Sequence, residues 1–101
     1  MTITRVTMFK LNEEDIEKVL AQYEVMKADS AKDGKPYMVS VNARRIYDDP
    51  RNQGFTLASH TTFANLEDMK YYDEGDAAHD ALRQVVKPLV KGPPMTVYWD
   101  S

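Results

Sequence analysis

Histidine is the residue best suited to acid–base chemistry near neutral pH, and this chain contains two, His60 and His79. The imidazole has an unperturbed pKa of about 6.5, so a histidine beside a cavity can act as a general base or acid. On a helical wheel of the segment after Gly75, His79 falls between Val86 and Val90, on the flank of the apolar stripe. That position suits a base with one nitrogen reachable from a cavity. It equally suits a half-buried histidine that is hydrogen-bonded to a carbonyl or a carboxylate.

Two tyrosines, a lysine and an arginine could supply hydrogen bonds or charge to the same site. Tyr71 and Tyr72 shortly precede His79. A phenol can donate to a developing oxyanion, although ring packing alone would explain either tyrosine. Lys27 falls within the apolar stripe of the first predicted helix, where it would either snorkel to water or face an anion-holding cavity. Arg5 could orient a carboxylate or enolate, or it could lie at a sheet end in water.

Other common site chemistries find little support in the sequence. Two histidines on different segments and the acidic run at residues 73–76 do not form a recognised metal-ligand spacing, so we expect no metal and no other cofactor. There is no glycine-rich phosphate loop and no serine in a nucleophile elbow. Cysteine is absent, which excludes disulfides and thiolate chemistry.

Composition places the chain among ordinary globular proteins. The 101 residues are 43% hydrophobic and 29% charged, with a net charge of -3. The basic residues are scattered, so we expect no nucleic acid as partner. We find no secretory signal and no apolar run of the roughly 18 residues that a membrane helix needs. We therefore expect a soluble cytoplasmic protein with no membrane partner.

The segments that hold these side chains alternate between strand and helix patterns. Asn12, with Asp15 as in a capping box, Asn65 and Asp76 are placed to cap helices. We predict strands at 2–11, 37–47, 55–63 and 95–100, a helix at 13–31, and a second helix in two pieces, one holding Leu66, Met69 and Tyr72 and one at 77–90. The order β-α-β-β-α-β predicts an α+β, ferredoxin-like single domain, 1–101, whose four-stranded antiparallel sheet carries both helices on one face.

One sheet face is then left uncovered. It would expose Val6 and Met8, or else Met95, Val97 and Trp99. An apolar surface of that size usually marks an interface, so we expect a homodimer that closes two sheets into a barrel. The alternative is a monomer with a mixed surface.

The orientation of His60 depends on which sheet face the helices cover. It would point into the dimer barrel if Leu57, Ser59 and Thr61 face the helices. A core or interface role explains this histidine more simply than a catalytic one.

Several stretches together resemble the stress-responsive dimeric α/β-barrel family, most closely a fungal branch. They are "RVTMFKL", "NQGFTLASHTTF", "LEDMKYYDEGDAAHDALRQVVKPLV" and "MTVYWD", and they span almost the whole chain. The resemblance implies a ferredoxin-like fold, a homodimer with an eight-stranded barrel, and a pocket between the helices and the sheet of each subunit. Many members of the family have no assigned activity and are linked to stress.

Other members are polyketide cyclases, such as the plant olivetolic acid cyclase, in which a histidine and a tyrosine drive an intramolecular aldol closure. The resemblance implies that His79 keeps the catalytic position and that Tyr72 or Tyr71 matches the tyrosine. The cyclase has further histidines at the positions of Arg5 and Leu57. We expect His79 and Tyr72 as the catalytic residues. We expect the substrate contacts to come from Arg5, Phe9, Tyr23, Lys27, Leu57, Ser59, Leu66, Met69, Tyr71 and Leu82.

The leading functional hypothesis is a cofactor-free enzyme of polyketide or phenolic metabolism. A general base would remove a proton between two carbonyls of a small apolar or phenolic molecule, and aldol closure, dehydration or decarboxylation would follow. The alternative is a non-catalytic, stress-responsive dimer that binds a small molecule in the same pocket. A haem- or quinol-using oxygenase is the least favoured hypothesis, because no clear set of haem ligands is present.

Overall fold

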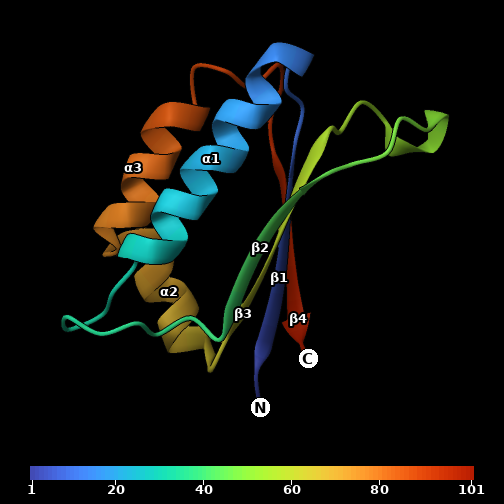
Figure 1. Cartoon of the computed structure of the whole chain (residues 1–101). Helices are drawn as coiled ribbons and strands as arrows, with labels where there is room; N and C mark the ends of the chain where they lie inside the picture. The colour runs from blue at the N-terminus through green and yellow to red at the C-terminus, as the bar shows by residue number, and fades with distance from the viewer.

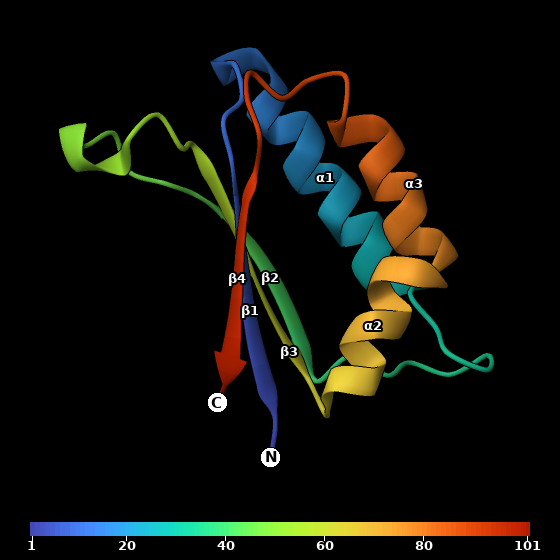
Figure 2. The same cartoon turned by 180° about the vertical axis from the view of Figure 1, so that it is seen from behind.

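Four strands pair into one antiparallel sheet in the order β2-β3-β1-β4, and the helices cover one of its faces (Figure 1). The computed structural model describes residues 1–101. Its elements are β1 (Ile3–Phe9), α1 (Glu13–Asp29), β2 (Ser40–Arg45), the short 3-10 turn η1 (Pro50–Asn52), β3 (Leu57–Phe63), α2 (Leu66–Glu74), α3 (Ala77–Val86) and β4 (Met95–Asp100). The view from behind again shows all three helices on the same side of the sheet (Figure 2). The predicted ferredoxin-like fold is confirmed.

Several elements are shorter than the sequence patterns predicted. The last helix ends at Val86 rather than at residue 90. Pro88 has no N–H to donate to the carbonyl four residues earlier, and the chain turns so that Leu89 donates to the Val86 carbonyl at 2.9 Å. The first helix ends at Asp29, where the Ser30 N–H closes the last turn onto Met26.

Two of the three predicted helix caps are confirmed. The Asn65 side chain accepts from the Asp68 N–H, and the Asp76 side chain accepts from the N–H groups of Ala78 and His79. The third prediction was wrong, because the Asn12 side chain makes no capping hydrogen bond. Its backbone carbonyl instead accepts from the Asp15 N–H at 2.9 Å.

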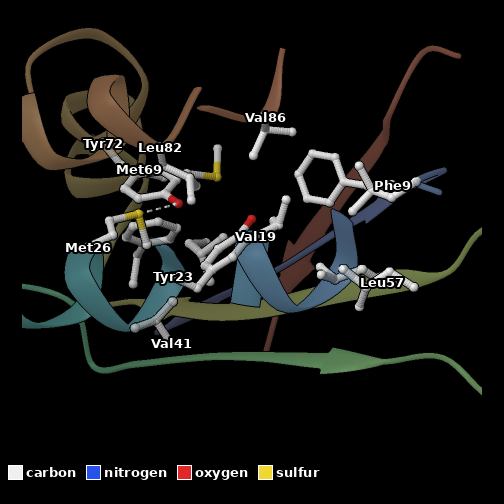
Figure 3. Packing of buried hydrophobic residues seen from close by; sticks show 14 residues of the cluster. Phe9, Val19, Tyr23, Met26, Val41, Leu57, Met69, Tyr72, Leu82 and Val86 are labelled. Carbon is white, nitrogen blue, oxygen red and sulfur yellow. Dashed lines mark hydrogen bonds between the residues drawn. The ribbon is translucent and has the colours of Figure 1, made fainter. Parts of the chain in front are cut away.

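The core lies between the sheet and the helices (Figure 3). Helix α1 contributes four buried side chains that recur every three or four residues, which is the spacing of one helix face. Leu57 and Phe63 of β3 pack against them and are fully buried. Buried residues alternate along β3, so Leu57, Ser59 and Thr61 face the helices and His60 points to the uncovered face.

The uncovered face carries both of the apolar groups that the sequence offered as alternatives. Val6 pairs with Val97 and Met8 with Met95 across β1 and β4, and side chains of paired residues share a face. Met95, Val97 and Trp99 are 40%, 43% and 49% exposed. One side of the sheet therefore presents a continuous apolar strip along β1 and β4.

Candidate functional site

A cavity of ≈ 280 Å³ lies on the helix-covered side of the sheet, against α3, β1 and β4. Helix α3 forms one wall, because Leu82 and Val86 follow His79 at the spacing of one helix face. Arg5, Thr7 and Phe9, alternate residues of β1, form the floor. The cavity also borders Tyr23 of α1, Ser59 and Thr61 of β3, Tyr72 and Asp73 of α2, and Thr96 of β4.

His79 is 6% exposed and is held in one orientation. Its Nδ1 lies 2.7 Å from the Tyr72 backbone carbonyl, and a carbonyl can only accept, so Nδ1 carries the proton. The imidazole stacks on the Tyr72 ring with centroids 3.6 Å apart and planes 11° apart. Nε2 has no protein partner. Ser30 Oγ is the one fully enclosed side-chain polar atom that lacks a hydrogen bond, so Nε2 is not fully enclosed. The His79 residue itself borders the cavity.

The surroundings of His79 keep the imidazole neutral. Burial, which penalises the charged form, lowers the pKa of His79 from 6.5 to about 4. The nearby charges of Arg83 and Arg5 lower the pKa further, and the hydrogen bond to the Tyr72 carbonyl opposes them. At neutral pH the side chain is therefore a free base whose available lone pair is on Nε2.

Tyr72 borders the cavity with its ring rather than with a free hydroxyl. The hydroxyl donates to Met26 Sδ at 3.4 Å, inside the core (dashed line in Figure 3). Burial raises the pKa of Tyr72, so the phenol stays protonated. Tyr72 therefore supports the His79 ring by stacking and through its carbonyl.

Arg5 reaches the same end of the cavity from the centre of the sheet. Its side chain is 13% exposed, and Nη1 donates to the Asp73 carboxylate at 2.8 Å. The guanidinium also lies 5.3 Å from the centre of the Tyr72 ring. Its remaining N–H groups make no hydrogen bond within the protein and are not enclosed, so they are available to a ligand oxygen.

Tyr23 and Ser59 place two further hydroxyl groups at the cavity wall. Burial raises the pKa of Tyr23 to about 12, and the Ser59 hydroxyl beside it and the charge of Arg5 oppose that rise. The Tyr23 hydroxyl is therefore neutral at physiological pH and can donate a hydrogen bond.

A second cluster fixes the first turn of α3, where His79 lies. The Asp76 carboxylate is 3% exposed and accepts from the backbone N–H groups of Ala78 and His79 at 2.9 and 3.4 Å. The Tyr37 hydroxyl donates to the same carboxylate at 2.6 Å. Tyr37 comes from the irregular segment between α1 and β2, so this segment is fastened to the helix that carries His79.

Seven of the twelve residues predicted for the site border this cavity. They are Arg5, Phe9, Tyr23, Ser59, Tyr72, His79 and Leu82. The cavity also borders residues that were not predicted, among them Asp73, Arg83, Val86 and Lys87. Arg83 and Lys87 follow His79 by four and eight positions, and that helical spacing was the signal available in the sequence.

The other five predicted residues lie elsewhere. Leu57 and Met69 are buried in the hydrophobic core, and Leu66 is 55% exposed at the start of α2. The Tyr71 hydroxyl donates to the Ala31 carbonyl, so this tyrosine fastens a loop. Lys27 is exposed and borders a separate groove between α1 and β2, because the buried stripe of α1 runs through positions 16, 19, 23 and 26. These five residues do not line the cavity.

No three histidine, aspartate or glutamate side chains come together where they could hold a metal ion. None of the helices combines the length and the apolar character that crossing a membrane requires.

Comparison with known proteins agrees with the fold. The family model described as "Stress responsive A/B Barrel Domain" matches residues 3–98. The chain belongs to this family. It is 39% identical over 98 residues to a protein of Gibberella zeae named "Fusaristatin A biosynthesis cluster protein", a match that covers 96% of this chain and 71% of the relative. Membership of a fungal branch of the stress-responsive barrel family is thus shown.

Solved structures with little sequence similarity share the fold. A dimeric ferredoxin-like protein of unknown function from Thermobifida fusca superposes with a TM-score of 0.80 at 13% identity, over 100% of this chain and 92% of that one. A hydroxynitrile lyase from Passiflora edulis gives a TM-score of 0.76 at 13% identity, over 97% and 91% of the two chains. At this identity the likeness shows the fold alone.

Proposed function

We propose that this family member is a cofactor-free enzyme of secondary metabolism that removes a proton from a carbon between two carbonyl groups. Its substrate class would be a small polyketide or phenolic compound, and His79 would be the general base. The observation that supports this most directly is the arrangement of the imidazole. Nδ1 is held by the Tyr72 carbonyl, Nε2 is left without a protein partner, and the His79 side chain borders the cavity.

The proposed reaction needs one proton acceptor and one stabiliser of negative charge. Nε2 takes the proton, and the electron pair of the broken C–H bond moves onto the neighbouring carbonyl oxygen to form an enolate. The free N–H groups of Arg5 hold that oxygen. The enolate carbon then forms a C–C bond to a third, more distant carbonyl of the same molecule, whose π electrons move onto its oxygen, and the His79 imidazolium gives the proton to the new alkoxide. Dehydration or decarboxylation would be variants that begin from the same enolate.

Two polar groups in an apolar cavity can supply a modest rate enhancement. General acid–base catalysis contributes roughly 10²–10⁴-fold and a positioned oxyanion donor roughly 10²–10³-fold. Proximity of the reacting carbons, imposed by the cavity wall, adds to both contributions.

Relatives support the metabolic setting. The Gibberella zeae relative takes its name from a biosynthesis cluster, and the Passiflora edulis neighbour is a lyase on the same fold. We infer from the first that this chain acts in secondary metabolism as well. The Passiflora edulis lyase is compatible with chemistry at a carbon atom in this fold.

We also propose that two copies pair through the uncovered sheet face. The apolar strip of Val6, Met8, Met95, Val97 and Trp99 lies on that face. A chain of this size buries little core of its own, so covering the strip would stabilise the fold. Solved neighbours from Bacteroides fragilis and Thermobifida fusca are described as dimeric, which supports this arrangement.

A direct test of the base uses hydrogen–deuterium exchange. The probe is an α-methyl β-ketoester in D2O, and proton NMR follows loss of the signal of the C–H between its two carbonyls. The wild-type protein should accelerate the exchange. His79→Asn should abolish the acceleration, because the asparagine amide can still donate to the Tyr72 carbonyl but has no counterpart of Nε2. His60→Asn, which alters the other histidine on the opposite sheet face, should retain it. Equal exchange in the wild type and His79→Asn would refute the assignment.

A non-catalytic small-molecule binder is the second candidate. One observation favours it, because the lowered pKa of His79 makes the imidazole a weaker base than a free histidine. In that case the probe would bind without accelerated exchange, and His79→Asn would change affinity alone.

A further inference from the structure

The cavity next to His79 carries an excess of positive charge that the proposed proton transfer does not require. Three basic side chains border it, Arg5, Arg83 and Lys87, against one acidic side chain, Asp73. The chain as a whole has a net charge of -3, so this local excess runs against the overall charge. Because Arg5 is paired with the Asp73 carboxylate and Arg83 forms a looser ion pair with Asp80 at 3.8 Å, the unpaired positive charge is that of Lys87.

Arg83 and Lys87 lie along one side of α3. They follow His79 by one and two helical turns, which places them about 6 and 12 Å from it along the helix axis. Arg83 donates to the Asp73 backbone carbonyl at 2.7 Å and lies 3.8 Å from Asp80. Lys87 is exposed and forms no ion pair and no side-chain hydrogen bond. Its ammonium group is free to meet an incoming anion.

The same helix presents apolar groups beside these charges. Leu82 and Val86 are buried where they border the cavity, and Phe9 faces them from β1. An uncharged small molecule would use this apolar wall and gain nothing from Lys87. A bare inorganic anion would use Lys87 and gain nothing from the wall. A molecule with an apolar body and an anionic end would use both.

We propose that the cavity binds an amphipathic carboxylic acid, with its apolar body against Phe9, Leu82 and Val86 and its carboxylate at the rim formed by Arg83 and Lys87. The assignment of this acid as the substrate rests on the proposed function. The binding preference itself does not. His79 lies about two helical turns from Lys87. If the carboxylate of the acid is bound at Lys87, the opposite end of the acid therefore lies beside Nε2 of His79. The reactive carbon of the acid is then at the end far from its carboxylate.

Paired probes that differ only in charge test this proposal. Isothermal titration calorimetry at low salt compares phenylhexanoate with its uncharged primary amide, phenylhexanamide, on the intact protein. We expect the acid to bind about ten-fold more tightly than the amide, because the ion pairs form at the edge of a low-dielectric wall. Added salt should weaken binding of the acid and leave binding of the amide unchanged.

The variants locate the preference on the rim. Lys87→Gln should weaken binding of the acid by about three- to five-fold, as expected for a partly exposed ion pair. Lys87→Glu should weaken binding of the acid further. Lys70→Gln, which alters an exposed lysine of α2 away from the cavity, should bind both probes as the wild type does. The Lys87 side chain is exposed and makes no hydrogen bond or ion pair, so these variants should fold.

Two results would overturn the proposal. They are equal binding of acid and amide to the wild type, and unchanged acid binding in both Lys87 variants. The His79→Asn protein should keep the preference for the acid, which separates the two proposals. Acid preference without C–H exchange would refute the proposed function and leave the rim site standing. C–H exchange without a preference for the acid would refute the rim site and leave the proposed function standing.

Discussion

Replacing His79 should change how the stability of the protein depends on pH. Burial lowers the pKa of His79 from 6.5 to about 4, so between these values the unfolded chain binds a proton that the folded protein does not. The stability that comes from keeping this imidazole neutral is present above pH 6.5 and is lost as the pH falls toward 4. For these two pKa values, the loss between pH 7 and pH 5 is about 2 kcal/mol.

Urea unfolding followed by circular dichroism at pH 7 and pH 5 measures this difference. Protein concentration is held fixed, because the unfolding of a dimer depends on it. The free energy of unfolding should fall by about 2 kcal/mol more in the wild type than in His79→Asn. If the wild type and His79→Asn lose the same free energy, the imidazole is not buried and neutral as described.

The rate of C–H exchange catalysed by the wild type should fall as the pH drops through about 4 rather than 6.5, because only the neutral His79 can accept a proton; a pH–rate profile measures the midpoint. Tyr37→Phe leaves the buried Asp76 carboxylate without its side-chain donor and should lower the free energy of unfolding by about 1–3 kcal/mol, whereas Tyr47→Phe, at a 92% exposed residue, should not. Val97→Glu should convert the dimer to a monomer in sedimentation velocity, whereas Val25→Glu, at a similarly exposed valine of α1, should not; dimers in both variants would place the interface elsewhere.

The order of elements was predictable because each has a local signal. Apolar residues alternate in β3 and recur every three or four positions in α1, and Gly75 separates α2 from α3. The caps at Asn65 and Asp76 were predictable for the same reason, since an N-cap is a contact over two or three residues. The helical period placed His79 at the edge of the apolar stripe, whereas the structure buries it on the same face as Leu82 and Val86.

The remaining features depend on contacts between distant parts of the chain. Tyr37 reaches Asp76 across 39 positions from a segment with no regular structure, and no local pattern indicates that pairing. Tyr71 and Tyr72 are adjacent, and their different roles depend on what surrounds the two rings. Lys27 was predicted within the apolar stripe of its helix, but the buried positions of α1 are 16, 19, 23 and 26, and Lys27 lies beside them with its side chain exposed.

The central claim is that a neutral His79 presents an unpaired Nε2 to the cavity, and the side-chain nitrogen resonances of ¹⁵N-labelled protein test it most directly. At pH 7 a long-range proton–nitrogen correlation spectrum should show Nδ1 as the protonated nitrogen and Nε2 as the unprotonated one. The Nε2 resonance should move when phenylhexanoate is added. A proton on Nε2 at pH 7, in the other tautomer or in the imidazolium form, would contradict the account.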